Sequence, residues 1–351
     1  MSTFRSTEDV SAAALSAYDA IIDVRSPSEF AEDRLPGAVN LPVLDDAERA
    51  EVGTLYVQVS RFEARRLGAA YVAKNIARHL ETALADRPSG FKPLIHCWRG
   101  GQRSHAMATI LSQVGWPVTL LSGGYKTWRR AVMRRLYEDA WPTRLVVLDG
   151  GTGTAKTELL ARLSGLGVQT LDLEGLAAHR GSLFGGFRDR PQPSQKLFES
   201  ELVAALDRLD WSRPVVIEAE SSKVGERIVP PALWAAMNAA PRIEVTASRE
   251  ARAAYLVRAY ADILEDREAL ETAFARLPVY PGRKRIETWR ELADAGEFVA
   301  IAEALMEHHY DPAYERSSRK DGRTVIGTVD AGRLGEAELE RAARQIADLV
   351  R

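Results

Sequence analysis

The decapeptide IHCWRGGQRS, residues 95–104, contains the only cysteine of the 351-residue chain. Because the thiolate is the nucleophilic form of cysteine, a reactive Cys97 needs positive charge or hydrogen-bond donors around its sulfur. Two glycines let the backbone turn its N–H groups inward, two arginines add full charges, and a helix beginning near Arg103 adds its positive end. This pattern favours an anion-binding loop over a buried, inert cysteine. The predicted catalytic residues are Cys97 and Arg103, and the predicted anion cradle comprises Trp98, Arg99, Gly100, Gly101, Gln102 and Ser104.

Two chemistries fit this loop, and the loop by itself leaves both open. A Cys-x5-Arg phosphatase would attack phosphorus with Cys97 and would need an aspartic acid to protonate the leaving group. A chalcogen transferase would instead carry sulfur or selenium on Cys97, as a persulfide or its selenium counterpart.

A second loop with chemical content is GGTGTAKT, residues 150–157, which resembles the phosphate-binding pattern G-x-x-x-x-G-K-[ST]. Backbone N–H groups would wrap a phosphate, Lys156 would pair with it, and the Thr157 hydroxyl would suit a magnesium ion. Ala155 replaces the last glycine and puts a methyl group in the crowded part of the loop, so we expect phosphate binding but not necessarily ATP hydrolysis. An ordinary glycine-rich turn is the alternative. The predicted diphosphate-binding residues are Gly150, Gly151, Thr152, Gly153, Thr154, Ala155, Lys156 and Thr157.

The segment LDLEGLAAHRGSLFGGF, residues 171–187, is too rich in charged residues, histidine and glycine for a plain connector. Long polar loops at the carboxyl edge of a parallel sheet bind ligands, although an exposed loop would have a similar composition. Glu218 ends the strand-like run VVIE, where it would either orient a metal through water or lie at the surface. The supporting candidates are Asp172, Glu174, His179, Arg180 and Glu218.

Composition limits the classes of protein that could carry these loops. Apolar residues make up 46% and charged residues 27% of the chain, and its length predicts two or three domains. A single cysteine excludes a disulfide framework and a zinc site built on several thiolates, so no metal other than magnesium at Thr157 is considered. There is no apolar run of about 18 residues and no signal-like N-terminus, so we expect a cytoplasmic protein that does not span a membrane.

The elements that must position the two loops alternate along the chain. Short apolar runs predict strands at residues 20–25, 93–97 and 117–121, and helices are predicted at 61–86 and 103–115. The second loop lies in a strand–turn–helix pattern, with further strands predicted at 215–221 and 242–248. The pattern predicts an α/β protein with parallel sheets.

Two domains are predicted, at residues 1–138 and 143–351, with the boundary near Trp141 and Pro142. Residues 249–351 are expected to be mainly helical, with a polar loop at 315–327. The net charge is −2, but ARR, WRRAVMRR, GRKR and ERSSRKDGR are local basic clusters. Such clusters either bind a polyanion or are solvated arginines on helix faces.

The flanks of the cysteine loop narrow its chemistry. DVRSPSEFAEDRLPGAVNLP, residues 23–42, and LSGGYKTWRR, residues 121–130, resemble the signature segments of the rhodanese family, over about residues 5–135. This resemblance implies a parallel-sheet domain that transfers sulfur through Cys97. Common single-domain members have Cys-x4-Arg, and the extra residue here enlarges the cradle, which would suit a donor with a phosphate-sized group such as selenophosphate.

The segments HCWRGGQRS, GGTGTAKTELL, LDLEGLAAHRGS, QPSQKLFE, IEAESSKVG and YDPAYERS together resemble the tRNA 2-selenouridine synthase family over nearly the whole chain. The resemblance implies a rhodanese-like domain joined to a P-loop NTPase-like α/β domain with a helical C-terminal part. It also implies that selenium from selenophosphate replaces sulfur in wobble 2-thiouridine of tRNA, through an S-geranyl intermediate made from geranyl diphosphate. Cys97 and residues 150–157 match the family's cysteine and P-loop.

The same resemblance implies the partners and the division of labour. The partners would be the tRNA anticodon stem–loop and selenophosphate synthetase as the donor source, with no tightly bound cofactor. The P-loop would hold geranyl diphosphate or a nucleotide, the basic clusters would follow the tRNA backbone, and Trp98 would stack on the flipped base or pack against the loop. The rivals are the phosphatase, a P-loop kinase with an idle rhodanese domain, and a tRNA-binding or sulfur-sensing module without turnover.

Overall fold

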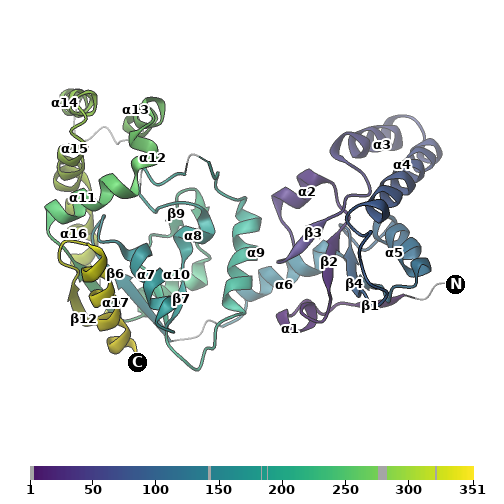
Figure 1. Ribbon diagram of the computed structural model, residues 1–351, viewed down its shortest axis with the longest axis horizontal. Helices are drawn as coiled ribbons and strands as arrows, with labels where there is room; N and C mark the ends of the chain where they lie inside the picture. The colour runs from purple at the N-terminus through teal and green to yellow at the C-terminus, as the bar shows by residue number, and fades with distance from the viewer. Residues whose placement is uncertain (1–3, 141–143, 183, 188, 276–282, 321) are drawn as a thin grey trace. The chain divides into compact units, whose positions relative to one another are not determined.

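The computed structural model describes residues 4–140, 144–182, 184–187, 189–275, 283–320 and 322–351. The chain divides into two compact units (Figure 1). Unit 1 contains Met1–Asp139 and Ser194–Asp207, and unit 2 contains Ala140–Pro193 and Arg208–Arg351. Each unit is built around a five-stranded sheet in which every described pair of neighbouring strands is parallel, which confirms the predicted α/β class.

Unit 1 has the strand order β1-β5-β4-β2-β3, so β4 is the middle strand. The strands are β1 (Arg5–Thr7), β2 (Ala20–Asp23), β3 (Ala38–Asn40), β4 (Pro93–His96) and β5 (Thr119–Leu121). The strands predicted at 20–25, 93–97 and 117–121 are thus confirmed as β2, β4 and β5. The described strands missed by the prediction are β1 and β3, which lie at the two edges.

Two of the helices of unit 1, α4 (Arg61–Glu81) and α5 (Gln102–Val114), bury one face of this sheet. The other helices of the unit are α1 (Ala12–Leu15), α2 (Pro27–Glu32), α3 (Asp46–Gln58), α6 (Tyr125–Tyr137) and α9 (Gln195–Leu206). Ile22 and Ile95 of the strands share a buried apolar cluster with Ile76 of α4 and Met107 of α5. Gly115 takes the left-handed conformation with φ +104° and ends α5, as its position in the sequence predicts.

Helix α9 belongs to unit 1, although it lies far along the chain. Trp128 Nε1 of α6 donates a hydrogen bond to Ser200 Oγ of α9 at 3.0 Å, and both residues are buried. Lys196 pairs with Glu32 at 2.6 Å. The predicted boundaries at 138 and 143 assign α9 to the second domain, whereas the contacts place it in unit 1. The boundary at Trp141 and Pro142 lies outside the described residues.

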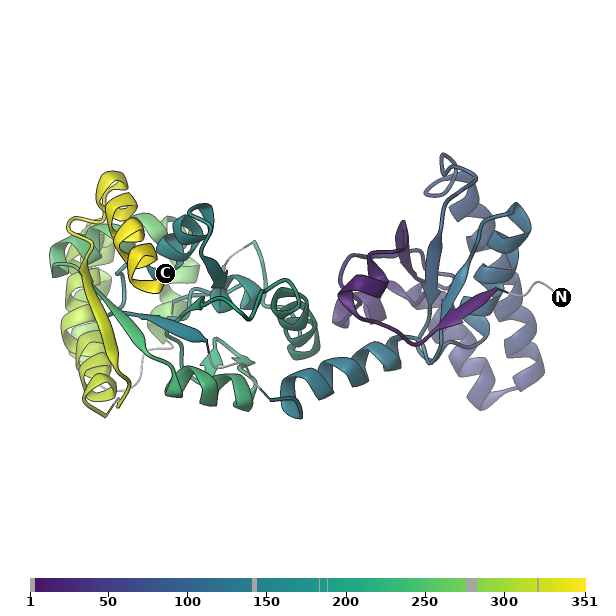
Figure 2. The ribbon, with the colours of Figure 1, turned by 90° about the horizontal axis from the view of Figure 1, so that it is seen from below.

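Unit 2 has the strand order β12-β11-β6-β8-β7, so β6 is the middle strand. The strands are β6 (Leu145–Asp149), β7 (Gln169–Leu171), β8 (Val215–Glu218), β11 (Arg242–Thr246) and β12 (Val325–Asp330). The strands β9 (Lys223–Val224) and β10 (Arg227–Ile228) form a separate antiparallel pair. Strands β8 and β11 confirm the predictions at 215–221 and 242–248. Figure 2 shows β12 at the edge of the sheet, beside β11.

Helices α7 and α17 cover one face of this sheet. Leu159 of α7 and Ile346 of α17 share a buried cluster with Leu148 of β6 and Val245 of β11. The helices are α7 (Lys156–Gly165), α8 (Leu173–Ala177), α10 (Pro231–Ala239), α11 (Arg249–Ala259), α12 (Ala261–Leu264), α13 (Arg267–Ala275), α14 (Arg283–Asp294), α15 (Phe298–Leu305), the π-helix η1 (Met306–Tyr310), α16 (Asp311–Lys320) and α17 (Glu336–Val350).

The C-terminal part of unit 2 is mainly helical, as predicted, and has its own apolar cluster. Leu270, Phe274, Trp289, Ile301 and Leu305 come from α13, α14 and α15. The polar loop predicted at residues 315–327 is too long, because α16 runs to Lys320 and β12 begins at Val325. Strand β12 is an edge strand whose side chains are mostly exposed.

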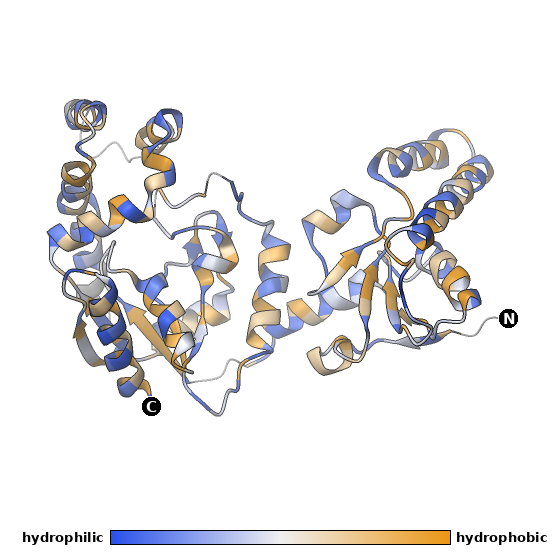
Figure 3. Ribbon diagram, viewed as in Figure 1, coloured by the Kyte–Doolittle hydropathy of each residue, from blue (hydrophilic) through white to orange (hydrophobic). Residues whose placement is uncertain are grey.

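Hydropathy follows this layered arrangement. Figure 3 shows the strands of both sheets mainly in the hydrophobic colour, while the helices alternate between the two colours. This alternation is expected where each helix turns one apolar side toward a sheet. Among the described residues, no helix is both long and apolar enough to span a bilayer.

Candidate active site

Cys97 directly follows the middle strand β4 and lies at the base of the loop that leads into α5. The Gly101 backbone N–H and the Ser104 hydroxyl each donate to Cys97 Sγ at 3.2 Å. Only 3% of Cys97 is exposed. Of the predicted cradle, Gly101 and Ser104 therefore face the sulfur, and these donors suit a sulfur that carries negative charge.

A glycine pair closes the other side of this loop. The Tyr125 N–H donates to the Cys97 carbonyl oxygen at 2.8 Å, and the Lys126 N–H donates to the Trp98 carbonyl oxygen at 3.3 Å. Gly124 has φ +59°, and a Cβ atom there would overlap the Cys97 carbonyl oxygen. Gly124 is thus required by the close approach of two backbones.

The two arginines of the loop have different environments. Arg103 Nη1 lies 2.7 Å from Glu29 Oε2, and Arg49 Nε lies 2.9 Å from the same oxygen. Burial would raise the pKa of Glu29, but the two guanidiniums lower that pKa below its ordinary value. Arg99 and Gln102 are exposed, and Arg99 has no carboxylate partner among the described residues. Arg103 is therefore ion-paired, and its catalytic role remains a prediction that requires this pair to open.

Trp98 packs within an aromatic stack. Its ring centroid lies 5.0 Å from that of Tyr125, and the Arg25 guanidinium lies 4.2 Å from the centroid of Tyr125. Arg25 is buried and pairs with Asp23 at 2.6 Å. Asp23 thus holds Arg25 against the ring of Tyr125, which in turn packs against Trp98. Stacking of Trp98 on a base remains a prediction.

His96 precedes the cysteine but adds no charge to the loop. Its side chain is fully buried, with Nε2 at 3.8 Å from Asp23 Oδ2. Burial lowers the pKa of His96 and outweighs the opposing effect of Asp23, so the imidazole is neutral at pH 7. The positive charge near the loop comes from arginine and lysine.

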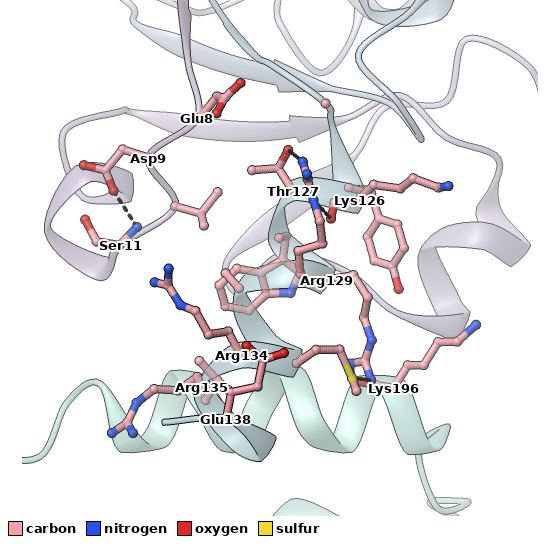
Figure 4. A pocket seen from close by; sticks show the side chains of 18 of the residues that line it. Glu8, Asp9, Ser11, Lys126, Thr127, Arg129, Arg134, Arg135, Glu138 and Lys196 are labelled. Atoms are coloured by element: carbon pink, nitrogen blue, oxygen red, sulfur yellow. Dashed lines mark hydrogen bonds between the residues drawn. The ribbon is translucent and has the colours of Figure 1, made fainter. Parts of the chain in front are cut away.

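A cavity of about 1260 Å³ lies beside the loop within unit 1, and Trp98, Arg99 and Tyr125 are among its lining residues. Figure 4 shows others, including Lys126 and Arg134. Lys126, Arg130 and Arg134 project from α6, four residues apart, and we call them the α6 stripe. In the part of the chain that the structure describes, none of the three has an ion-pair partner, unlike Arg129, which pairs with Glu199. Four residues correspond to about 6 Å along a helix, comparable with the spacing of phosphates along one RNA strand.

The other predicted basic clusters contribute less. In ARR, Arg66 pairs with Glu63 at 2.6 Å on an exposed face of α4, as a solvated arginine does. In GRKR, residues 282–285, only the Arg285 side chain is described, and it is exposed; much of ERSSRKDGR, residues 315–323, lies outside the described side chains.

The second loop joins the middle strand β6 to α7, as its motif predicts. Lys156 Nζ donates to the Gly150 carbonyl oxygen at 2.9 Å and Thr154 Oγ1 donates to the Gly151 carbonyl oxygen at 2.8 Å. Gly153 has φ +84°, and a Cβ atom there would lie 3.0 Å from the Leu256 side chain. Lys156 therefore bridges the loop across the space in which a phosphate would bind.

Ala155 is accommodated in a way that the sequence did not predict. Its φ of +58° is left-handed, which costs about 1 kcal/mol for a residue other than glycine. Ala155 is 3% exposed and belongs to the buried apolar cluster that contains Leu159. The expectation that its methyl group crowds the loop is corrected, because the methyl group packs into the core.

Carboxylates gather behind the P-loop. Thr157 Oγ1 donates to Glu174 Oε2 at 2.5 Å, and the Glu174 N–H donates to Glu218 Oε1 at 2.8 Å. Burial, followed by neighbouring carboxylates, raises the pKa of Glu218 well above its ordinary value, and burial and Glu174 raise the pKa of Glu220 to about 8. Glu218 is completely buried, so the alternative of a surface carboxylate is wrong.

The remaining candidates line a cavity of about 930 Å³ around the P-loop, together with Glu174 and Glu220. Asp172 caps α8 by accepting from the Gly175 N–H at 2.7 Å, and His179 Nδ1 accepts from the Gly181 N–H at 3.2 Å. Arg180 pairs with Asp262 at 2.8 Å. These partners fix the positions of Asp172, His179 and Arg180 at the cavity wall. Glu218 is the one supporting candidate that does not line the cavity, because it is completely buried.

The helical part supplies site residues that the sequence reasoning missed. Arg252 Nε of α11 donates to the Thr152 carbonyl oxygen at 2.8 Å, and Arg252 pairs with Asp311 at 2.6 Å. Tyr255, Leu256 and Tyr310 also line the cavity. No motif marks these residues; only the expectation that helices after a P-loop sheet return to its carboxyl edge could have found them.

Both halves match known family models. Residues 7–131 match the model of the rhodanese-like domain, and residues 143–275 match that of the tRNA 2-selenouridine synthase AAA domain. These matches agree with the predicted rhodanese-like and P-loop folds of the two halves.

Relatives named tRNA 2-selenouridine synthase align along most of the chain. The protein of Cupriavidus pinatubonensis is 32% identical, over 92% of this chain and 95% of its own length. The relative from Hahella chejuensis is 34% identical over 89% of this chain and 88% of its own, and that from Shewanella halifaxensis is 30% identical over 87% and 90%. The chain therefore belongs to the tRNA 2-selenouridine synthase family.

Proposed function

We propose that this protein converts wobble 2-thiouridine of tRNA to 2-selenouridine with selenophosphate as donor, through an S-geranyl intermediate made from geranyl diphosphate. The observation that carries the proposal is that a chain of this family holds two separate anion loops, of which only one contains a nucleophile. The reaction has two steps with different needs: the first expels a diphosphate, and the second transfers selenium.

In the first step, the sulfur of 2-thiouridine attacks C1 of geranyl diphosphate. A C–S bond forms, the C–O bond breaks, diphosphate leaves with the electron pair, and N3 of the base releases its proton. Lys156 and the loop N–H groups would stabilise the charge of the leaving diphosphate. Mg²⁺ prefers oxygen ligands, and the hydroxyl of Thr157 and the carboxylate of Glu174, 2.5 Å apart, fit it; held there it would neutralise leaving-group charge.

In the second step, selenium displaces the alkylated sulfur. The Cys97 thiolate would attack C2 of the base, the bond from C2 to the alkylated sulfur breaks, and geranylthiol leaves after taking up a proton. The selenium of selenophosphate then attacks C2, and Cys97 leaves as the thiolate. Water cleaves the P–Se bond, which releases phosphate and leaves the selenocarbonyl with N3 protonated. The donors around Cys97 and the nearby cations suit a nucleophilic thiolate and a phosphate-sized group. Selenophosphate synthetase would supply the donor.

We assign recognition of the tRNA backbone in unit 1 to the α6 stripe. Lys126, the first residue of the stripe, lies next to the cysteine loop, because its backbone N–H donates a hydrogen bond to the Trp98 carbonyl oxygen. A cation without a carboxylate partner gains more binding free energy from a phosphate than a cation that is already paired. Such contacts make the affinity for tRNA depend on the salt concentration. The anticodon strand would follow α6 toward Trp98.

Nucleoside mass spectrometry tests the proposal. Purified protein is incubated with 2-thiouridine-containing tRNA, geranyl diphosphate and selenophosphate, beside Cys97→Ser and the matched control Gln113→Ala at the exposed end of α5. We expect selenouridine from the wild type and the control, and only the S-geranyl base from Cys97→Ser. Unchanged tRNA with all three proteins, combined with Cys97-dependent hydrolysis of an aryl phosphate, would favour the phosphatase instead.

A further inference from the structure

A second, apolar cavity lies in the helical part of unit 2, next to the P-loop. Its volume is about 70 Å³, and α11, α12, α13 and α15 form its walls. The lining side chains include Leu256, Ile263, Leu270, Phe274, Phe298 and Ile301. None of the described residues that line it has a carboxylate, ammonium, guanidinium or imidazole group. The cavity therefore offers dispersion contacts and exclusion of water, and no charge.

This apolar cavity adjoins the P-loop cavity. Both are lined by Thr152, Ser182, Leu256, Tyr260 and Tyr310, and Leu256 packs against the loop at Gly153. Tyr310 ends the π-helix η1, a rare element that often occurs at functional sites. A ligand whose phosphates lie in the loop thus has an apolar space directly beside it.

The residues that the two cavities share carry hydroxyl groups but no charged group. The Ser182 hydroxyl and the Tyr260 hydroxyl lie 2.7 Å apart and bind each other. Burial raises the pKa of Tyr260, so its phenol stays neutral. A nucleoside would need hydrogen-bond partners for its base and ribose, because unpaired polar groups are costly to bury. A hydrocarbon chain has no such need.

We propose that this cavity binds the hydrocarbon chain of the substrate whose diphosphate lies in the P-loop, and that its floor limits the length of that chain. The inference rests on the proposed function, because it assigns the prenyl end of the same diphosphate ester. A phosphate loop beside an uncharged apolar cavity matches an amphiphile with a diphosphate head.

Two of the aromatic rings that line the cavity pack together, and we place its floor at them. The rings of Phe184 and Phe274 meet edge to face with centroids 6.3 Å apart, and Phe274 is 1% exposed. A volume of about 70 Å³ corresponds to roughly five to seven water-sized positions. That space holds the outer part of a chain of two isoprene units, and a third unit would meet Phe274.

Calorimetry with geranyl, farnesyl and inorganic diphosphate tests the cavity. Ala302→Phe adds a ring inside the cavity, and Val299→Phe adds the same ring on the exposed side of α15. We expect Ala302→Phe to weaken the binding of geranyl diphosphate about 30-fold or more and the binding of inorganic diphosphate by about twofold or less. Val299→Phe should change neither affinity.

Phe274→Ala tests the floor and remains informative if Ala302→Phe does not fold. The ratio of the affinity for farnesyl diphosphate to the affinity for geranyl diphosphate should rise by about tenfold. Leu339→Ala, a deletion in the sheet-facing core of α17, controls for general loss of stability and should leave this ratio unchanged. The product of tRNA alkylation by Phe274→Ala should shift from geranyl to farnesyl in the same direction.

The outcomes separate the two proposals. If the wild type alkylates tRNA but the cavity variants keep wild-type affinity and chain preference, the cavity inference is overturned and the proposed function stands. If the wild type binds ATP more tightly than geranyl diphosphate and leaves tRNA unalkylated, the proposed function fails as well.

Discussion

The cysteine loop and the P-loop share one architecture. Each follows the middle strand of a five-stranded parallel sheet, β4 in unit 1 and β6 in unit 2, and each leads into a helix. Neither α5 nor α7 has a side-chain cap hydrogen bond at its N-terminus. The first backbone N–H groups of both helices are therefore available to an anion.

What differs is the group at the centre of each loop. In the cysteine loop the donors of Gly101 and Ser104 already point at a nucleophilic sulfur. In the P-loop, Lys156 is bonded to the Gly150 carbonyl oxygen and Thr157 to Glu174, so both must exchange partners when a diphosphate binds. Under the proposed function, one backbone design would serve covalent transfer in the loop that contains a thiol and reversible diphosphate binding in the loop that does not.

Lys156→Ala should produce the largest difference between the two loops. We expect the kcat/KM of tRNA geranylation to fall about 10²–10³-fold, because the principal cation facing the leaving diphosphate is removed. Selenation of tRNA that has been geranylated beforehand should change by about twofold or less. Lys223→Ala, at an exposed site in unit 2, is the control. Equal loss of both steps would show that the two loops serve one shared reaction.

Replacing the α6 stripe with alanines should weaken tRNA binding by roughly 10–10²-fold at low salt. The slope of log affinity against log salt should fall by about three, one for each lost phosphate contact. Filter binding over a salt series measures both quantities. The matched triple on α4, Arg65, Arg66 and Lys74 to alanine, should leave the slope unchanged. If the α6 variant lost less tRNA affinity than the α4 variant, the assignment of tRNA recognition to the α6 stripe would be wrong.

Glu220→Gln should change how the P-loop unit responds to pH. The pKa of Glu220 is about 8 in the folded state against 4.5 for an ordinary glutamate, so the folded protein holds a proton that the unfolded chain has lost. Its contribution to stability is therefore present below pH 4.5 and is lost as pH rises to about 8. Above that pH its negative charge also opposes diphosphate.

The Glu220→Gln variant should consequently show a flatter dependence of Tm on pH and tighter diphosphate binding at about pH 9 than the wild type. Thermal melts and calorimetry from about pH 6.5 to 9.5 measure these effects. The control is Glu291→Gln, at an exposed position of α14. A wild-type Tm that rises with pH across this window, with no difference for Glu220→Gln, would contradict the assignment.

Ser200→Ala should have the smallest effect, and it tests whether α9 is part of the cysteine-loop unit. The change leaves the buried Trp128 Nε1–H without its partner, which costs about 1–3 kcal/mol of unfolding free energy. Hydrogen exchange should become faster in α6 and α9 and stay unchanged around β6. Ser112→Ala on α5 should stay within about 0.5 kcal/mol. Faster exchange in unit 2 alone would place α9 there.

Local patterns explain why both loops were predictable. Strand, glycine-rich turn and helix are consecutive in each case, so the N–H groups that form the anion site come from neighbouring residues. Cys97, the loop glycines and Lys156 could therefore be named without the fold. The same reasoning misjudged Ala155, because the direction of its methyl group depends on the core beneath the loop.

Contacts between segments that lie far apart in the chain could not be predicted from the sequence. Glu29 pairs with Arg103 across 74 positions, and Arg252 holds the Thr152 carbonyl oxygen across 100 positions. The membership of α9 in unit 1 is of the same kind. Nothing in local periodicity distinguishes such a helix from any other helix of the second half, since the partner that buries it lies elsewhere in the chain.

The sequence by itself determined the two glycine-rich strand–turn–helix loops, the parallel α/β class and the place of the single cysteine in one of these loops, because these depend on residues that are neighbours in the chain. Only the tertiary structure decided the ion pair that holds Arg103, the raised pKa of Glu220 and the apolar cavity beside the P-loop. Each of these arises from burial among side chains that folding brings together, and burial is set by packing rather than by spacing.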